Sequence, residues 1–495
     1  MTKKSRSAII VYTLKQRVTQ EELTTMIKLR AHQADALKAV TKAIKKGKGS
    51  AVGRVVMPTG AGKTFVEAAV IEFQRKDNVK TKIHLVLAPR ILLTNQLIGE
   101  FRKFSGLTYR AIAFHSGNHE PDYEAGIKWK EEATIRVEKI EEAYKNAVSA
   151  GQDIVVFSTY HSADKLIGID FDTMIADESQ YCVNEGFNEV IRKLTARVKL
   201  FFTATEKHTA SDKGRGLNNT TIYGERLYYI SPATLIQLGL IVPPRLHVMY
   251  GETRDEDKSI VSEVLEIARA QHDITVQELG FSKILFAMKG TDDVKNIEDN
   301  IAKVRAEFPD HDVFTITSKN GARINNEVVD RELTFLPALT TSKNCLIFHY
   351  DILSEGIDVD GITGVVLLRN MGLAKLLQTI GRAVRVYKPN PGAKRWALIS
   401  VSVLNGDEDD KENVKYYVSA IRDGGYDISA EDVVETGKPR HMADEENVDD
   451  AYGKAKNNFA SLFITEIIHE VEEEDFFDEL RQLSSDRAKI DMLFS

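Results

Sequence analysis

The chain has 495 residues, of which 43% are hydrophobic and 28% are charged, a composition typical of soluble globular proteins. This length predicts two or three domains. No apolar run is long enough to span a bilayer, and residues 7–14 are too short and too mixed for a signal peptide. Cys182 and Cys345 stand far apart without a CxxC pair, which argues against a disulfide framework and a zinc site. An intracellular, cytoplasmic protein without a membrane partner is expected.

The net charge of −7 is unevenly distributed along the chain. Residues 406–495 contain 25 acidic and 10 basic residues, about −15, so residues 1–405 carry about +8. A mildly basic body is compatible with phosphate binding.

Two regions alternate β-rich apolar runs with helix-length segments, the pattern of a parallel α/β sheet. Short runs of this kind suit buried parallel strands. The runs of the first region are Val52–Met57, Ile83–Ala88, Ile154–Phe157, Thr173–Ala176 and Lys199–Phe202. Those of the second region are Lys283–Ala287, Val313–Thr317, Cys345–His349, Gly364–Leu368 and Arg395–Val401. The predicted fold is α/β, with one architecture used twice.

A helix is predicted over Gln33–Ile44, ahead of the first strand. The preceding segment, from Leu29, ends at Gln33, and Arg30 and Gln33 are expected to bind the nucleotide. A glutamine carries both a carbonyl and an amide group, so Gln33 is suited to bind the N6 and N7 edge of adenine. An exposed helical glutamine without that role is the alternative.

The strongest local signal is the stretch Met57–Thr64, which lies between the first strand and a helix predicted over Phe65–Phe73. Its two glycines permit the backbone N–H groups to surround phosphate oxygens, and the helix N-terminus adds positive potential. Lys63 would reach the β- and γ-phosphates of ATP, and the Thr64 hydroxyl would ligate Mg²⁺. Met57 replaces the first glycine of the general pattern. The nucleotide-binding residues expected in this loop are Pro58, Thr59, Gly60, Ala61, Gly62, Lys63 and Thr64.

An acidic pair follows the run Thr173–Ala176. Asp177, at the end of this strand, is suited to hold Mg²⁺, and Glu178 is suited to orient and deprotonate the attacking water.

Two segments interrupt the α/β pattern. Residues 120–152 read as an exposed helical insertion, with a nucleic-acid-guiding arm as the alternative, and residues 227–244 carry the proline and glycine spacing of a linker.

In this order the motifs resemble those of superfamily 2 helicases and translocases, the DEAD/DEAH-like proteins, over about residues 28–402. The motifs that carry the resemblance are Gln33, Pro58–Thr64, Ala88–Arg90, Ser158–Tyr160, Asp177–Gln180, Thr203–Thr205, Ser354–Asp358 and Gln378–Arg385. The resemblance implies two RecA-like lobes, at residues 28–228 and 245–405, joined by a linker at 229–244. Residues 1–27 would be an N-terminal extension and residues 406–495 an acidic, mainly helical C-terminal region.

The resemblance also implies roles for further residues. ATP and Mg²⁺ would bind in the cleft between the lobes, where Gln378, Arg382 and Arg385 would act on the transferred phosphate. Gly356 and Asp358 would serve both ATP and the nucleic-acid strand. The implied phosphate contacts along the strand are Arg90, Ser158, Thr159, Thr317 and Ser318.

Residues 223–244 are similar to the connecting segment of restriction-type motor subunits, XPB-like unwinders and phage branch-migration helicases. Double-stranded, forked or branched DNA is therefore favoured over RNA, and a phage-encoded protein acting in a host cytoplasm fits the resemblance. The alternatives are an ATP-gated clamp, a motor subunit of a restriction or defence assembly without unwinding activity, and an RNA helicase. The acidic C-terminal region is expected to cap the second lobe, with docking of a protein partner or imitation of DNA as alternatives.

Overall fold

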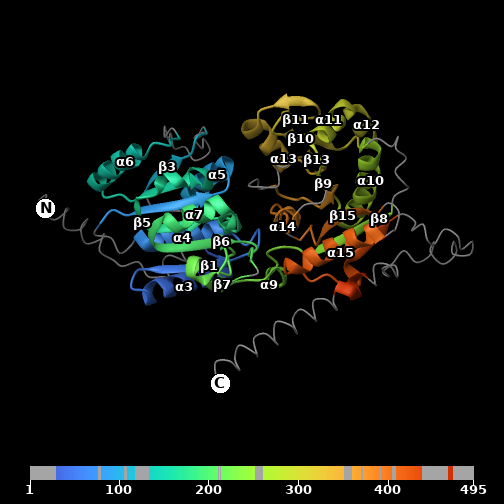
Figure 1. The fold of residues 1–495 in the computed structure, drawn as a ribbon. Helices are drawn as coiled ribbons and strands as arrows, with labels where there is room; N and C mark the ends of the chain where they lie inside the picture. Colours follow the sequence, from blue (N-terminus) through green and yellow to red (C-terminus); the bar gives the residue numbers. More distant parts are fainter. Residues whose placement is uncertain are drawn as a thin grey trace, which may run out of the picture. The chain divides into compact units, whose positions relative to one another are not determined.

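A computed structural model describes residues 29–75, 80–104, 109–117, 133–209, 211, 213–250, 260–350, 359–368, 372–390, 392–403, 408–436 and 467–471. The chain forms two compact units, one ending at Ile230 and the other beginning at Ser231. Each unit contains one β-sheet with helices packed on it (Figure 1). The predicted α/β fold with two sheets is confirmed.

The sheet of the first unit has seven strands within the described residues, in the order β3-β4-β2-β5-β6-β1-β7, and all its pairings are parallel. Because the strands are parallel, their carboxyl ends lie at one edge, where loops carry the predicted site residues. The five predicted strands all form, and β3 and β7 are additional. The strands are β1 (Ala51–Val56), β2 (Ile83–Ala88), β3 (Arg110–Phe114), β4 (Ile154–Thr159), β5 (Asp170–Ala176), β6 (Thr195–Thr203) and β7 (Glu225–Tyr229).

Helices cover both faces of this sheet. Leu85 and Leu87 of β2 face a core that includes residues of α6 and α7, whereas the intervening Val86 points to the opposite face because side chains alternate along a strand. On that opposite face α3, α4 and α5 contact one another in turn. The helices are α3 (Ala31–Lys46), α4 (Lys63–Arg75), α5 (Ile91–Phe104), α6 (Val137–Ala150), α7 (Glu185–Lys193) and α8 (Thr220–Tyr223), with short 3₁₀ turns η2 (Tyr160–Leu166) and η3 (Ser179–Val183).

The sheet of the second unit has nine strands within the described residues, in the order β12-β11-β10-β13-β9-β14-β15-β8-β16. Its pairings are parallel except for those of β11 with β10 and β12. The five predicted strands form again as β9, β10, β13, β14 and β15. The strands are β8 (Pro244–Tyr250), β9 (Lys283–Ala287), β10 (Asp312–Thr317), β11 (Gly321–Ile324), β12 (Glu327–Val329), β13 (Cys345–His349), β14 (Gly364–Leu367), β15 (Ala397–Val403) and β16 (Val433–Thr436).

Two further segments of the chain bear on the sequence predictions. The region 227–244 contains the end of β7, the helix α9 and the first residue of β8. Beyond residue 405, α15 contacts α14, and β16 pairs with β8 at the sheet edge. The helices are α9 (Pro232–Gln237), α10 (Ile260–Leu279), α11 (Thr291–Asp299), α12 (Ile301–Glu307), α13 (Leu336–Thr341), α14 (Leu373–Ala383) and α15 (Glu408–Asp423), with short helical turns η4 (Arg331–Phe335) and η5 (Ala430–Asp432).

Within the part of the chain that the structure describes, no helix combines the length and the apolar character that crossing a lipid bilayer requires.

Candidate nucleotide-binding site

The predicted phosphate loop joins β1 to α4 at the carboxyl edge of the first sheet. It is fixed at its start, where the Met57 N–H donates to the Thr203 carbonyl at 2.9 Å, and inside, where the Ala61 N–H donates to the Pro58 carbonyl at 3.1 Å. Gly62 has a φ of +80°, and a Cβ there would lie 2.2 Å from Gln33 Nε2. Only glycine fits this position without strain or a shift of Gln33. The loop leads directly into α4, whose first residue is Lys63.

Two side chains of α3 hold this loop from the other side. Gln33 Nε2 donates to the Ala61 carbonyl at 3.0 Å, and Gln33 Oε1 accepts from the N–H of Arg30 at 2.9 Å. His32 Nε2 lies 2.9 Å from the same Ala61 oxygen, so this nitrogen carries the proton. Burial lowers the pKa of His32, which favours the neutral ring. Sequence reasoning identified Gln33 but missed His32; the side chain of Arg30 is exposed.

The acidic pair lies beside the loop, at the end of β5. Lys63 Nζ is 3.6 Å from Glu178 Oε1, and both side chains are largely buried. Asp177 is 5% exposed, and its Oδ1 accepts from the Glu178 N–H at 2.8 Å. Glu178 adopts a left-handed φ of +49°, a conformation that costs a non-glycine residue about 1–3 kcal/mol. The structure thus brings together Lys63, Asp177 and Glu178, as the sequence predicts.

Burial and mutual charge shift the protonation of this cluster. Burial raises the pKa of Asp177 to about 7, and the neighbouring Glu178 carboxylate acts in the same direction. Burial alone would lower the pKa of Lys63, but the charges of Glu178, Asp177 and Glu67 outweigh it, so the net direction is upward. A buried site with more carboxyl groups than cations is electrostatically prepared for an additional positive charge.

A chain of hydrogen bonds runs from the acidic pair to the end of β6. Gln180 Nε2 donates to Glu178 Oε2 at 2.8 Å, and the Thr203 hydroxyl lies 2.7 Å from Gln180 Oε1. The same hydroxyl lies 2.7 Å from the Thr205 carbonyl and accepts from the Thr205 N–H at 3.1 Å. Because a hydroxyl has one hydrogen, Thr203 donates to Gln180 or to the Thr205 carbonyl, but not fully to both. A chain of hydrogen bonds therefore connects Asp177–Gln180 with Thr203–Thr205.

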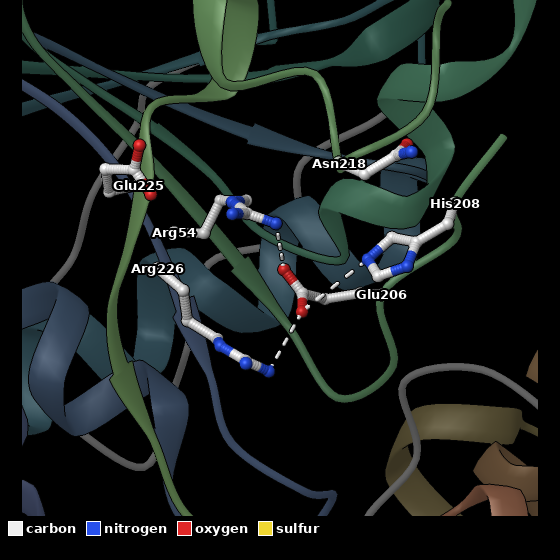
Figure 2. A pocket seen from close by; sticks show the side chains of 6 residues that line it. All are labelled: Arg54, Glu206, His208, Asn218, Glu225 and Arg226. Carbon is white, nitrogen blue, oxygen red and sulfur yellow. Dashed lines mark hydrogen bonds and ion pairs between the residues drawn. The ribbon is translucent and has the colours of Figure 1, made fainter. Parts of the chain in front are cut away.

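The residue after Thr205 anchors this strand end. Glu206 pairs with Arg54 of β1 and, more loosely, with Arg226 at 3.3 Å and His208 at 3.7 Å. Figure 2 shows these side chains converging on Glu206. They line a cavity of about 410 Å³. Arg54 is 7% exposed and also donates from Nε to the Gly224 carbonyl. This cluster, which the sequence did not indicate, ties the Thr203–Thr205 segment to the strand that precedes the phosphate loop.

A buried tyrosine forms a hydrogen bond with the backbone of the acidic pair. Tyr160 is buried, and its hydroxyl donates to the Asp177 carbonyl at 2.7 Å. The position was in the predicted motif Ser158–Tyr160, but its contact with Asp177 was not foreseen.

The predicted nucleic-acid contacts of the first unit differ in exposure. The side chain of Arg90, after β2, is exposed, whereas those of Ser158 and Thr159 are buried. Ala88, two residues before Arg90, is the pairing partner of Thr159 where β2 and β4 run parallel. Arg90, Ser158 and Thr159 therefore belong to the same edge of the sheet. The Ser158 hydroxyl donates to the Thr159 carbonyl, and the Thr159 hydroxyl donates to Ser162 Oγ.

The remaining predicted residues belong to the second unit. Thr317 ends β10 with a buried hydroxyl that accepts from the Asn320 N–H at 2.8 Å, and Ser318 is exposed. Gln378 and Arg382 lie four residues apart on α14 and thus on one helix face. Arg382 is 6% exposed. Gly356 and Asp358 lie outside the described residues.

Arg385 is held by its backbone just beyond α14. It forms an antiparallel bridge with Ile241, and its carbonyl accepts from Lys394 Nζ at 2.7 Å. Lys394 is almost fully buried and also donates to the Ala383 carbonyl, so it closes the C-terminal end of α14. Burial, helped by the charge of Arg385, lowers the pKa of Lys394 to about 7.

Comparisons with known proteins bear on the family and the fold. Residues 26–208 match the family model described as the type III restriction enzyme res subunit. No curated protein matched the sequence.

Similar solved structures include three helicase or restriction proteins. The ATP-dependent type ISP restriction-modification enzyme LlaBIII bound to DNA has a TM-score of 0.65 and 16% identity, over 89% of this chain and 33% of that enzyme. A fragment of an HsdR subunit of a type I restriction enzyme from Vibrio vulnificus YJ016 has a TM-score of 0.51 and 19% identity, over 84% and 71% of the two chains. The DEAD-box helicase Mss116 bound to ssRNA has a TM-score of 0.50 and 16% identity, over 86% and 82%.

The chain spans about a third of the length of the type ISP enzyme it matches. Its first unit carries the sequence features of the res-subunit family, and the fold of the whole is shared with restriction enzymes and a DEAD-box helicase. The chain therefore has the α/β architecture of tandem RecA-like units and resembles the superfamily 2 helicases and translocases, as its motifs had indicated.

Proposed function

We propose that the chain is an ATP-driven nucleic-acid translocase whose track is duplex, forked or branched DNA. The observation that carries this proposal is the pairing of Lys63 with Glu178 at 3.6 Å, beside the buried Asp177 and the phosphate loop. A lysine at a loop of this kind and two acids at the end of another strand of the same sheet are the groups that nucleoside triphosphate hydrolysis requires.

The first unit supplies the groups that bind and orient ATP. The loop N–H groups and Lys63 bind the β- and γ-phosphates, while Gln33 turns from the Ala61 carbonyl to the adenine edge. Glu178 orients a water molecule and accepts its proton as the oxygen attacks the γ-phosphorus; the bond from that phosphorus to the β–γ bridging oxygen breaks, and ADP leaves. Gln180 fixes the second oxygen of Glu178, which keeps the carboxylate directed into the site.

The donor atoms at this site fit Mg²⁺. The Thr64 hydroxyl and the Asp177 carboxyl are hard oxygen donors, and the surplus of buried carboxyl groups favours a cation. Thr64 and Asp177 would hold the ion, which would neutralise the charge that develops on the phosphates.

The second unit supplies guanidinium groups for the same reaction. In this proposal Gln378, Arg382 and Arg385 act on the γ-phosphate of ATP bound to the first unit. Hydrolysis then requires both units, and an arginine acting in this way is worth about 10³–10⁵ in rate. Gly356 and Asp358 are proposed to respond to both ATP and the strand.

The track is proposed to lie along the carboxyl edges of the sheets. Arg90 and Ser318 are exposed and contact phosphates directly. Ser158, Thr159 and Thr317 take part through hydroxyl groups that exchange their present intramolecular partners for phosphate oxygens. Similarity to restriction enzymes, one of them solved with DNA, supports DNA as the track.

An ATP-gated clamp, such as the motor-like subunit of a restriction assembly, is the second candidate. It is favoured because this chain spans only a third of the length of the similar type ISP enzyme LlaBIII. In such an assembly other domains would perform cleavage.

One experiment tests the proposed ATPase activity and the proposed track. ATP hydrolysis by the purified chain is measured with single-stranded, duplex, forked and four-way DNA and with single-stranded RNA, at low and high salt. We expect duplex or forked DNA to stimulate turnover most and the stimulation to fall steeply with salt. Greater stimulation by RNA would replace the DNA track with an RNA track. Absence of turnover with every nucleic acid would contradict the ATPase itself.

A further inference from the structure

A buried carboxyl group near the phosphate loop has no role in the mechanism above. Glu67 lies on α4, four residues after Lys63 and three after Thr64, so all three side chains share one face of the helix. Glu67 is fully buried, and neither of its carboxyl oxygens has a hydrogen-bond partner among the described residues. An unpartnered buried carboxyl group is strongly destabilising, which makes its presence here unusual.

The surroundings of Glu67 are those of the nucleotide site. Its carboxyl group lies within hydrogen-bonding reach of Asp177, but two ionised carboxylates offer each other no hydrogen. Lys63 and Glu178 are also close enough to affect its charge. Three acids thus surround one lysine.

We propose that Glu67 is an additional carboxylate of the magnesium site and binds the ion, directly or through a metal-bound water, together with Thr64 and Asp177. This inference rests on the proposed function, because the cation would enter with the nucleotide. Among the described residues no group of three or more His, Cys, Asp or Glu side chains could hold a metal ion by itself. Phosphate oxygens of the nucleotide are therefore needed to complete the coordination of Mg²⁺.

A rival role is purely structural: a protonated Glu67 that donates to Asp177 and holds it in place. The two roles differ in one measurable property. A residue that serves the cation affects cation affinity, whereas a protonated hydrogen-bond donor is replaced without loss by the amide of glutamine, which also donates.

The experiment measures Mn²⁺ binding to the full chain by electron paramagnetic resonance, in the presence of saturating ADP. ADP binding itself is measured separately in EDTA by calorimetry. The variants are Glu67→Gln, which is isosteric, still donates and therefore separates the two roles, and Glu67→Met, which is of similar size and apolar and removes both roles at once. Glu72→Gln is the matched control, because Glu72 is a buried glutamate on the same helix but lies five residues farther from the loop.

We expect both Glu67 variants to bind Mn²⁺ about 10- to 100-fold more weakly than the wild type, the range known for residues that support metal ligands. ADP affinity in EDTA should stay unchanged, and Glu72→Gln should match the wild type. Mn²⁺ affinity of Glu67→Gln within twofold of the wild type would overturn this inference and leave the proposed function intact. A wild-type chain that binds no ADP under any condition would overturn the proposed function and this inference with it.

Discussion

Lys63 Nζ lies 3.6 Å from Glu178 Oε1, an ion pair that joins the phosphate loop to the end of β5 inside the first unit. The ion pair helps to hold both side chains in place. The two residues nevertheless have different proposed tasks, since Lys63 binds phosphate and Glu178 acts on water. The pair therefore predicts two different losses of function.

Lys63→Ala should weaken ATP binding, whereas Glu178→Gln should retain binding and lose hydrolysis by at least about 10²-fold, the lower range for a general base. Nucleotide affinity and single-turnover hydrolysis measure the two effects separately. Retention of the unfolding temperature in both variants is the control for folding. Turnover at the wild-type rate in Glu178→Gln would show that another group activates the water.

Gly62→Ala should weaken nucleotide binding. The added methyl group puts the strain of a positive φ into the phosphate loop and displaces Gln33, whose Nε2 would lie 2.2 Å from the new Cβ. Gly168→Ala is the matched control in the same unit, because Gly168 has a φ of +102° and open space around it. Both variants should lose about 1–2 kcal/mol of stability, but only Gly62→Ala should lose ATP affinity. Equal nucleotide binding in both would contradict the proposed fit of the loop.

Arg54→Met should destabilise the first unit far more than Arg226→Met. Both arginines pair with Glu206 (Figure 2). Arg54 is buried, and its replacement leaves the buried Glu206 carboxylate without this partner, whereas the Arg226 side chain is 50% exposed. Loss of a buried partner costs about 3–5 kcal/mol, and loss of an exposed one less than about 1 kcal/mol. Denaturant unfolding of the two variants gives the comparison. Similar costs would mean that Arg54 does not anchor the Thr203–Thr205 segment.

The second unit should lose stability as the pH falls from about 6.5 to about 4. Burial lowers the pKa of His247 to about 4, and burial with the charge of His272 lowers that of His311 to about 4. In this window the unfolded chain binds protons that the folded chain cannot, so acid favours unfolding. A full shift of one such histidine corresponds to about 3 kcal/mol at most.

Replacement of His247 by Gln should reduce the slope of stability against pH, and the double variant with His311→Gln should reduce it further. Thermal unfolding between pH 4.5 and 7.5 measures these slopes. The His247 ring also contacts Ser400 and Thr436, so a lower stability at neutral pH is expected as well. An unchanged slope in the double variant would assign the acid sensitivity to other groups.

The sequence predicted the parts of the fold that are encoded locally. Buried parallel strands such as β2 and β9 are continuous apolar runs, and both were located to the residue. β7, with the sequence Glu-Arg-Leu-Tyr-Tyr, and the three-residue β12 lack such runs. They are strands only because a neighbouring strand pairs with them, which a local pattern does not report.

The residues of the candidate site also divide into those that a local sequence pattern predicts and those that depend on distant partners. The phosphate loop and the acidic pair each lie within a few consecutive residues next to a strand, so their chemistry was visible in the sequence. His32, Glu67 and Tyr160 act through partners 17 to 110 residues away, such as Ala61 and Asp177. The ion pair of Arg54 with Glu206 spans 152 residues. Such contacts depend on the tertiary fold and carry no local signature.

The central claim is that ATP hydrolysis moves this chain along DNA. The most direct test is displacement of a third strand from a DNA triplex placed downstream on a duplex, since a translocase removes it without unwinding the duplex. We predict ATP-dependent displacement by the wild type and none by Lys63→Ala or Arg385→Ala. Hydrolysis of ATP on duplex DNA without any displacement of the third strand would contradict the translocase and support the clamp.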